Sequence, residues 1–271
     1  MVDYVDKIGE ALEYYRDHPI EFAIDMLGFR EDYIWPKMVE LCEAVRDHQY
    51  VAVRAGHSVS KTFSLGRIIV PWFKVCHTPS TVVTTAPSDN QVRNQLWREI
   101  RAAHSGAKVE LGGKMNKVDW DAVPSKEVLA SLPPEDRPNW EKNFAIGFST
   151  SPDSTAEHAT KMQGWHNEWV LVVLDEACGI LPAIWRTAME GLITDAQCKV
   201  IAIGNPTDPD CDFADACRSS DEELMEGNEP YTSDKGWHVI TIAATDTPNY
   251  KEGRRVIPGL ASREWVEKII Q

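Results

Sequence analysis

Two segments of the sequence carry residue types that bind phosphate and a divalent cation. The first, RAGHSVSKT (54–62), follows a β-branched run and ends on Lys61 and Thr62 at the start of a helix-like stretch. A phosphate-binding loop has the pattern G-x-x-x-x-G-K-[ST], in which backbone N–H groups and a helix N-terminus meet the phosphate oxygens. Lys61 would reach the β- and γ-phosphates, and Thr62 would offer its hydroxyl to Mg²⁺. Ala55 and Ser60 stand at the two glycine positions, so the loop requires that Ser60 has no need of a strongly positive φ.

The second segment, LVVLDEA (171–177), ends an apolar run on Asp175 and Glu176. At the end of a buried strand, one carboxylate can hold Mg²⁺ while its neighbour polarises an attacking water. Taken alone, the segment is equally an acidic strand cap. A Lys-Thr loop after one strand and an Asp-Glu pair after another form a paired nucleotide signature, because ligands bind at the strand ends of open α/β sheets. The pair predicts an ATPase.

Two further segments follow expected strands. IAIGNPT (201–207) places polar side chains where they could sense the γ-phosphate, although a Gly-Asn-Pro turn is the simpler interpretation of this segment alone. TTAPSDNQV (84–92) runs from a strand into a polar loop and a helix, an element that contacts nucleic acid or relays motion in translocating ATPases. As the third segment in this order, IAIGNPT resembles the sensor strand of a motor ATPase.

These segments need a scaffold of alternating strands and helices. Apolar residues at helical spacing predict helices over 6–19 and 35–48, ahead of the first strand. We expect strands over 50–55, 80–88, 142–150, 168–177, 198–207 and 236–245, and helices over 61–76, 89–105, 183–193 and 261–271. The Gly- and Pro-rich stretch 105–142 is expected to be an irregular insertion or a hairpin. The alternation predicts a mostly parallel, doubly wound α/β sheet flanked by helices.

The composition is that of an ordinary globular chain, with 271 residues of which 43% are hydrophobic and 26% are charged. No apolar run reaches the roughly 18 residues that a membrane span needs. The acidic, amphipathic N-terminus lacks the features of a signal peptide, so the default expectation is the cytoplasm. The net charge of −14 argues against a protein that coats DNA by charge alone, and leaves room for local basic contacts.

The cysteines form no C-x-x-C pair. They stand at positions 42, 76, 178, 198, 211 and 217. The close pair Cys211 and Cys217 has no histidine at zinc-finger spacing, so a zinc site is not expected. We expect reduced and mostly buried thiols.

The four segments, in this order, resemble the large terminase subunit of tailed bacteriophages, a family that packages DNA into proheads. The resemblance rests on VAVRAGHSVSKT, VVTTAPSDNQVRNQLWREIR, MQGWHNEWVLVVLDEACGI and VIAIGNPTDP, and spans about residues 30–260. It implies a P-loop ATPase of the additional-strand, RecA-like type. In the whole protein, a C-terminal nuclease domain of RNase H-like fold is expected to follow.

The resemblance also implies roles for individual residues. Arg54 is implied to contact the phosphates, Asp175 and Thr62 to bind Mg²⁺, and Glu176 to act as the catalytic carboxylate. The implied catalytic set is Glu176, Arg54 and Lys61. The nucleotide-binding loop comprises Arg54, Ala55, Gly56, His57, Ser58, Val59, Ser60, Lys61 and Thr62. The coupling element comprises Gly204, Asn205 and Thr207.

Besides the two replaced glycines, the chain departs from the family pattern in two places. Many relatives read adenine with a Gln that follows an aromatic residue, whereas this chain has YIWPKM (33–38), so Trp35 or Tyr33 is expected to stack on the base. Relatives often carry an Arg that acts on the ATP of a neighbouring subunit, and here that position is Gln163. The candidates for this trans-acting role are Lys161, Arg98 and Arg101. A surface salt bridge is the alternative for each.

The expected function is ATP hydrolysis that powers the translocation of double-stranded viral DNA into proheads. The implied partners are DNA, the portal of the prohead, the small terminase subunit, the nuclease domain and further copies in a ring, in the host cytoplasm. Three parts are expected: a helical segment at 1–48 on the adenine side, an ATPase core at 49–210, and a C-terminal part at 211–271 that leads to the nuclease domain. The sequence has no nuclease motif and stops inside a helical pattern, so this chain is expected not to cut DNA.

Two other functions stay open. A helicase or repair ATPase would need arginine motifs from a second RecA-like domain, which the sequence does not contain. A nucleotide-binding assembly module without turnover is suggested by Ala55 and Ser60. For the DNA contact, the candidates are Arg93, Arg98 and Arg101 on the helix after TTAPS, with a solvated helix face as the alternative.

Overall fold

The computed structural model describes residues 2–150, 165–193, 195 and 197–270. Within these residues, nine strands form one sheet in the order β3-β4-β5-β2-β6-β7-β1-β9-β8. They are β1 (Tyr50–Ala55), β2 (Ser80–Ala86), β3 (Lys114–Met115), β4 (Asp119–Asp121), β5 (Phe144–Ser149), β6 (Trp169–Asp175), β7 (Cys198–Gly204), β8 (Tyr231–Thr232) and β9 (His238–Ile242). The six central strands are parallel, and the short β3, β4 and β8 add antiparallel edges. The predicted α/β sheet is confirmed, and the stretch 105–142 contributes the expected hairpin as β3 and β4.

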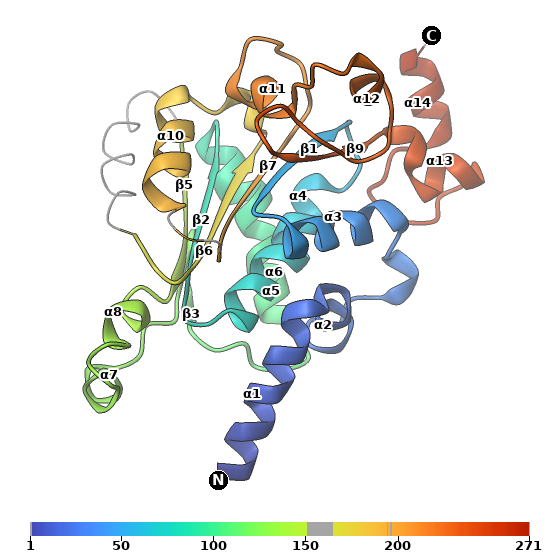
Figure 1. Ribbon diagram of the computed structural model, residues 1–271. Coiled ribbons are helices and arrows are strands. Elements are labelled where there is room, and N and C mark those ends of the chain that lie inside the picture. Colours follow the sequence, from blue (N-terminus) through green and yellow to red (C-terminus); the bar gives the residue numbers. More distant parts are fainter. Residues whose placement is uncertain (1, 151–164, 194, 196, 271) are drawn as a thin grey trace.

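Apolar side chains bury both faces of the sheet. Along β6, Leu171 and Val173 face one hydrophobic cluster, whereas Val170, Val172 and Leu174 face the other. The first cluster is covered by α1 (Val2–Asp17), α2 (Pro19–Asp25), α3 (Pro36–Asp47), α4 (Lys61–Ser64), η2 (Leu65–Ile69), α5 (Val70–Cys76), η3 (Gln91–Leu96) and α6 (Trp97–Gly106). The second is covered by α10 (Pro182–Thr187), η5 (Ala188–Leu192) and α11 (Asp212–Cys217), on the opposite side of the sheet (Figure 1). A strand buried on both faces explains the near-continuous apolar run of β6.

The remaining elements are short and lie around this three-layer core. They are η1 (Glu31–Tyr33), α7 (Lys126–Ser131), α8 (Arg137–Trp140), η4 (Ala177–Gly179), α12 (Glu222–Glu226), η6 (Ala244–Asp246), α13 (Pro248–Glu252) and α14 (Arg263–Ile270). None of the described helices has the length and the hydrophobicity to cross a lipid bilayer.

The helix that follows the phosphate loop changes its hydrogen-bonding register halfway. Residues 61–76 are continuously helical, with π-helical geometry in η2 directly before α5. Pro71 lies in the first turn of α5 and has no N–H to donate, which accounts for the irregular turn before it. Gly66 allows a close crossing with α6, because a Cβ atom there would lie 2.7 Å from the Cβ of Glu99.

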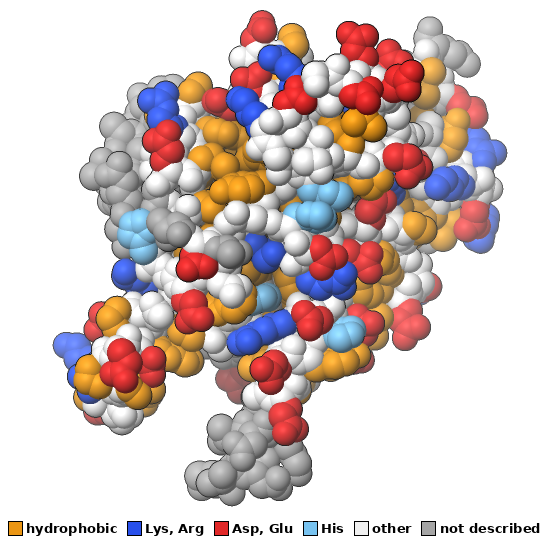
Figure 2. Space-filling view, in the orientation of Figure 1, with side chains coloured by type: hydrophobic (Ala, Val, Ile, Leu, Met, Phe, Trp, Pro, Cys, Tyr) orange, Lys and Arg blue, Asp and Glu red, His pale blue; other side chains and the backbone are white. Residues whose placement is uncertain are grey.

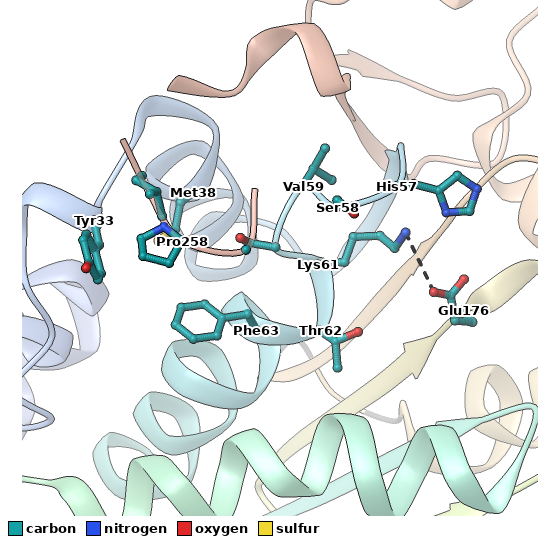
Figure 3. Close-up of a pocket in the computed structure, with 13 residues that line it drawn as sticks. Tyr33, Met38, His57, Ser58, Val59, Lys61, Thr62, Phe63, Glu176 and Pro258 are labelled. Carbon is teal, nitrogen blue, oxygen red and sulfur yellow. Dashed lines mark ion pairs between the residues drawn. The ribbon is translucent and has the colours of Figure 1, made fainter. Parts of the chain in front are cut away.

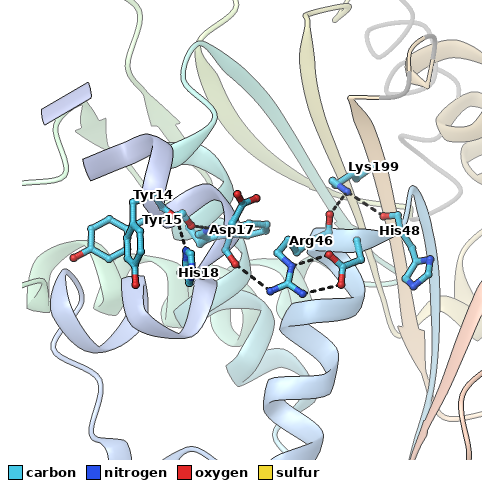
Figure 4. A network of polar contacts seen from close by, with 9 residues as sticks. Tyr14, Tyr15, Asp17, His18, Arg46, His48 and Lys199 are labelled. Atoms are coloured by element: carbon cyan, nitrogen blue, oxygen red, sulfur yellow. Dashed lines mark hydrogen bonds and ion pairs between the residues drawn. The ribbon is translucent and has the colours of Figure 1, made fainter. Parts of the chain in front are cut away.

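Cations fix the N-terminal helices to the sheet by binding the carbonyls at their C-terminal ends (Figure 4). Lys199 on β7 donates to the carbonyl oxygens of Arg46 and His48 at 2.7 and 3.2 Å. Arg46 in turn donates to the carbonyl of Asp17, at the end of α1, at 3.0 Å. Positive groups at helix C-termini satisfy free carbonyls and favour the helix dipole. The position of the 35–48 helix beside the phosphate pocket therefore depends on this network.

Directly after α5, His77 lies buried among aromatic rings. Its ring stacks on Phe73 at 4.4 Å and tilts against Trp169 at 4.7 Å, and its Nδ1 atom has no hydrogen-bond partner. Burial, followed by the positive charge of Arg16, lowers the pKa of His77 to about 3. The neutral imidazole is therefore the form that the folded chain tolerates.

We predict that this histidine makes the folded chain less stable in mild acid. The unfolded chain takes up a proton at His77 near its ordinary pKa of about 6.5, and the folded chain does not. The contribution of His77 to stability is therefore complete above pH 6.5 and is lost as the pH falls toward 3, by roughly 1 kcal/mol between pH 7.5 and 5.5. Urea unfolding should show that lowering the pH from 7.5 to 5.5 destabilises the wild type by this amount relative to His77→Phe. The raised pKa of Asp175 acts in the opposite direction in both chains and cancels in this comparison. His104→Gln, at a half-exposed position, should keep the pH dependence of the wild type; the same pH dependence in His77→Phe would refute the assignment.

Candidate active site

The phosphate loop lies between β1 and α4 and is held from the C-terminal part of the chain. The N–H of Gly56 donates to the carbonyl of Ile242 at 3.0 Å, and the N–H of Ala261 donates to the carbonyl of Ser58 at 3.0 Å. β9 also pairs with β1 along its length. Residues beyond 240 thus belong to the same site as the loop at 54–62.

The loop backbone takes up left-handed geometry at two serines. Ser58 has φ of 54°, and Ser60 has φ of 65° at the N-terminal end of α4. The condition that Ser60 has no need of a strongly positive φ is therefore not met: the glycine position of the motif keeps its glycine-like conformation with a serine in it. Left-handed geometry costs an L-residue roughly 1–2 kcal/mol, which the surrounding contacts must offset.

Lys61 lies across the mouth of this loop. Its side chain is 8% exposed, and its Nζ donates to the carbonyl of Gly56 at 3.0 Å. The same nitrogen lies 3.8 Å from Oε1 of Glu176 (Figure 3). The structure therefore brings together the lysine of the first segment and the glutamate of the second.

Thr62 and Asp175 form the second link between the two segments. The Thr62 hydroxyl donates to Oδ2 of Asp175 at 3.1 Å, and the N–H of Glu176 donates to Oδ1 at 3.1 Å. Asp175 has no exposed surface, and burial together with the adjacent charge of Glu176 raises its pKa to about 7. Both of its oxygens are thus hydrogen-bonded inside the protein.

The side chain of Glu176 faces the pocket, whereas the side chain of Asp175 is enclosed. The backbone of Glu176 has φ of 50° and ψ of 49°, and its side chain is 33% exposed. This left-handed residue links β6 to η4, and of the two carboxylates one is enclosed and its neighbour faces the pocket. The two acidic residues therefore have different environments, as their separate predicted roles require.

β7 lies between β6 and β1 and brings the third segment to the site. A Cβ atom on Gly204 would lie 2.9 Å from the amide nitrogen of Ala177, so the end of β7 touches the turn after Asp175. Nδ2 of Asn205 lies 2.8 Å from Nε2 of His57 in the phosphate loop. Thr207 is exposed and does not line the pocket. Of the three expected coupling residues, Gly204 and Asn205 thus contact the other site segments.

The loop opens into a pocket of about 470 Å³ with two different ends. Figure 3 shows Lys61 and Glu176 at one end, and Tyr33, Met38, Phe63 and Pro258 toward the other. The full lining is Tyr33, Met38, His57, Ser58, Val59, Ser60, Lys61, Thr62, Phe63, Glu176, Ile257, Pro258 and Gly259. Charged groups and an apolar wall in one pocket fit a ligand with an anionic tail and a flat, apolar head.

Trp35 does not line this pocket. It is 3% exposed and lies in the hydrophobic core at the start of α3, whereas Tyr33, the other expected aromatic residue, does line the pocket. The sequence-based placement of Trp35 at the nucleotide is therefore wrong in this structure, because the indole is enclosed by the helices that cover the sheet. Phe63, one residue beyond the motif, was missed, although its position after Lys-Thr was a usable signal.

The wall at 257–259 could not be found from the sequence. It is built by Asn249, which is 2% exposed and whose Nδ2 donates to the carbonyls of Ile257 and Leu260 at 3.0 and 3.1 Å. Its Oδ1 accepts from the N–H groups of Val256 and Ile257, both at 2.8 Å. A single buried amide thus shapes the turn that faces the phosphate loop, and no local motif marks it.

The expected arginines lie away from the pocket. The Arg54 side chain donates to the carbonyl of Met225 at 2.7 Å and lies 3.4 Å from the Tyr231 hydroxyl, and it does not line the pocket, so its contact with the phosphates stays a prediction. The side chain lies away from the pocket because Arg54 is within β1, before the turn of the loop. Arg98 pairs with Glu99 at 2.9 Å, and Arg101 donates to the carbonyls of Lys117 and Arg93. Lys161 and Gln163 lie outside the described residues.

Comparisons with known proteins support the predicted fold. No protein-family model and no curated protein matches the sequence. In structure, the chain is similar to a point mutant of the ATPase domain of the large terminase of Thermus phage P74-26, with a TM-score of 0.51 and 12% identity over 89% of this chain and 94% of that chain. The unmutated domain aligns over the same shares with 14% identity and a TM-score of 0.48. The first likeness confirms the predicted fold class, a P-loop α/β sheet, and agrees with the resemblance found in the sequence.

We predict that Ser60→Gly leaves the folded chain as stable as the wild type or more stable by up to about 1 kcal/mol. Glycine removes the cost of left-handed geometry, roughly 1–2 kcal/mol, and adds roughly 0.5–1 kcal/mol of unfolded-state entropy. Urea unfolding followed by circular dichroism measures the difference.

Ser64→Gly is the matched control, because Ser64 has φ of −63° in the same helix. Glycine there should lower stability by about 1 kcal/mol. A clear loss of stability in Ser60→Gly would mean that the hydroxyl group, and not the backbone, holds this position.

Proposed function

We propose that this chain is a Mg²⁺-dependent ATPase and the ATPase domain of a large terminase, in which hydrolysis drives double-stranded viral DNA into proheads. The observation that carries the proposal is the meeting of Lys61 and Thr62 with Asp175 and Glu176 beside one pocket. The likeness of fold to a phage terminase ATPase domain supports the same conclusion.

In this proposal, ATP lies along the pocket with its phosphates at the charged end. The backbone of 57–62 and the N-terminus of the helix at Lys61 offer N–H groups to the phosphate oxygens. The base lies against the apolar wall of Tyr33, Met38, Phe63 and Pro258. Shape and apolar contact would thus replace the glutamine with which many relatives read adenine.

The residues at the charged end fit a magnesium ion. Thr62 lines the pocket with its hydroxyl oxygen, and the enclosed carboxylate of Asp175, 3.1 Å behind it, would act on the ion through that hydroxyl or through a water. Mg²⁺ typically takes one or two protein oxygens together with phosphate oxygens and waters. When bound, the ion neutralises charge that develops on the β- and γ-phosphates. No group of three or more metal-binding side chains occurs among the described residues, which suits an ion held largely by its nucleotide.

Lys61 and Glu176 would then carry the chemistry. The Lys61 ammonium, now on the Gly56 carbonyl, is within reach of a γ-phosphate in the loop and stabilises the negative charge of the transition state. Glu176 is partly exposed beside it and can hold the attacking water in line. Asn205, on His57, would sense whether the loop holds a γ-phosphate.

The proposed DNA contact is weak for one copy of the chain. Arg93 pairs with Asp89 at 2.6 Å, and Arg98 pairs with Glu99 at 2.9 Å. Acidic neighbours therefore offset the positive charge of the arginines that are the candidates for DNA contact. Acidic side chains also gather over α12 (Figure 2). A ring of copies that bind in turn, together with the portal, the small terminase subunit and the nuclease domain, would supply the hold that one copy lacks.

The test of turnover is phosphate release with Mg-ATP. We predict that Lys61→Ala lowers the rate at least about a hundredfold, because it removes charge stabilisation in the transition state. Glu176→Gln should lower the rate about a hundredfold and still bind a fluorescent ATP analogue, because the side chain keeps its size and loses the charge that orients water.

Lys126→Ala and Glu127→Gln, on the exposed face of α7, are the matched controls and should keep wild-type turnover. Nucleotide binding without turnover in the wild type would favour the assembly module. DNA-stimulated turnover with strand separation would favour a helicase. Wild-type turnover in Lys61→Ala would refute the proposed site.

We predict that the isolated chain binds duplex DNA with a shallow salt dependence. With a net charge of −14 and paired arginines, it can neutralise only a few phosphates, roughly three or fewer. A plot of log affinity against log salt measures that number. Arg98→Ala should weaken binding more than Arg186→Ala, an exposed arginine on the opposite face. A slope of about six phosphates or more would show a dedicated DNA surface elsewhere.

A further inference from the structure

Two cysteines far apart in the sequence lie in contact beside the active site. Sγ of Cys178, in η4, is 3.1 Å from Sγ of Cys211, which caps the N-terminus of α11. η4 packs directly against α11, so the contact belongs to two neighbouring backbone elements and not to one flexible side chain. A disulfide bond is about 2.05 Å long, so a movement of roughly 1 Å would join the two sulfurs.

The surroundings of this pair favour the thiolate at Cys178 and the thiol at Cys211. Burial and the hydrogen bond with Cys178 raise the pKa of Cys211, and Sγ of Cys211 donates to the carbonyl of Asp208 at 3.2 Å. The N–H of Asp208 donates to Sγ of Cys178 at 3.3 Å, and the N–H of Ala214 donates to Sγ of Cys211 at 3.4 Å. Burial alone would raise the pKa of Cys178, but the hydrogen bonds from Cys211 and Asp208 outweigh it and lower that pKa. Cys178 is therefore the thiol of the pair that ionises first and attacks.

Exposure separates this pair from every other cysteine of the chain. Cys178 and Cys211 are partly exposed, whereas Cys42, Cys76, Cys198 and Cys217 are buried. Burial raises the pKa of Cys42 and of Cys217 to about 12, which makes these thiols inert. Four of the six thiols are buried, as expected, and the pair in contact is Cys178 and Cys211, not the pair Cys211 and Cys217 that is close in the sequence.

We propose that Cys178 and Cys211 form a thiol pair that is oxidised to an internal disulfide by low-molecular-weight disulfides such as oxidised glutathione. The Cys178 thiolate attacks one sulfur of the disulfide, forms a mixed disulfide and releases one glutathione thiolate. Cys211 then gives its proton to the released glutathione thiolate, and its sulfur attacks the Cys178 sulfur, closes the internal bond and releases the second glutathione thiolate. Two protein thiols are oxidised and one glutathione disulfide is reduced to two thiols.

The bond would tie two segments of the site together. Cys178 comes two residues after Glu176, and Cys211 follows the segment 205–210 that leaves β7. The N–H of Gly179 already donates to the carbonyl of Glu176 at 2.9 Å, so the turn that carries Glu176 is continuous with the tethered residue. Oxidation should therefore restrain both the turn after Asp175 and the segment 205–211 that follows β7.

The experiment treats the full chain with oxidised glutathione and counts free thiols after denaturation. Two of the six thiols should be lost, and peptide mapping under non-reducing conditions should recover a Cys178–Cys211 link. Closing the loop between them should raise the Tm by roughly 5 °C, and a reductant should reverse it. Amide hydrogen exchange should slow at 176–179 and 208–211 in the oxidised chain.

Cys211→Ser and Cys178→Ser make the step order testable. Cys211→Ser should stop at one glutathione on Cys178, because the second thiol is absent, whereas Cys178→Ser should react more slowly. If a variant does not fold, peptide mapping of the wild type still decides. Six free thiols after treatment, or a link through Cys42, Cys76, Cys198 or Cys217, would overturn the proposal. None of these measurements depends on ATP hydrolysis, so failure here and failure of the proposed function are distinguishable.

Discussion

The enclosed carboxylate of Asp175 is the constraint on which the rest of the site depends. An ionisable group with no exposed surface costs several kcal/mol unless its oxygens are hydrogen-bonded. Here the Thr62 hydroxyl and the N–H of Glu176 supply the two bonds. The first requires α4 to begin beside the end of β6, although β7 separates β6 from β1. The second comes from the next residue, Glu176, which leaves β6 in a left-handed conformation. The junction of the two loops thus satisfies both oxygens of this side chain.

Backbone strain collects at the same place. The non-glycine residues with positive φ within the described chain are Ser58, Ser60 and Glu176, and all three line the pocket. A hydrogen bond holds the carbonyl of each: the carbonyl of Ser58 accepts from the N–H of distant Ala261, whereas those of Ser60 and Glu176 accept from Ser64 and Gly179 in the turns that follow them. Strain of roughly 1–3 kcal/mol per residue persists only where surrounding structure determines the conformation. The loop therefore keeps left-handed geometry at Ser60, a glycine position of the motif, because contacts with the surrounding structure hold the serine in that conformation.

Local sequence patterns predicted the parts of this structure that depend on local physics. The strands at β1, β2, β5, β6, β7 and β9 follow from apolar runs, and the junction of Lys61 with Glu176 follows from strand ends sharing one edge of a parallel sheet. The differences from the expected arrangement lie where distant contacts decide. Trp35 belongs to the core because several helices enclose it, and Arg54 points to Met225 because its strand position precedes the loop turn. The wall at 257–259 depends on the buried amide of Asn249. No local sequence pattern predicts that this asparagine makes four hydrogen bonds.

The end of β7 and the residues that follow it, 204–211, contact both loops of the site. Gly204 lies against the turn after Asp175, and Asn205 bonds to His57 in the phosphate loop. A few residues later, Cys211 contacts Cys178 on the far side of the same turn. A change in either loop must therefore shift the segment 204–211 or break one of these contacts. Because packed elements move between discrete arrangements more readily than they deform, the segment has few ways to respond. In the proposed motor, that limited response would allow a small change at the γ-phosphate to reach a surface outside the pocket, and α11, which starts directly after Cys211, would be the element that carries it.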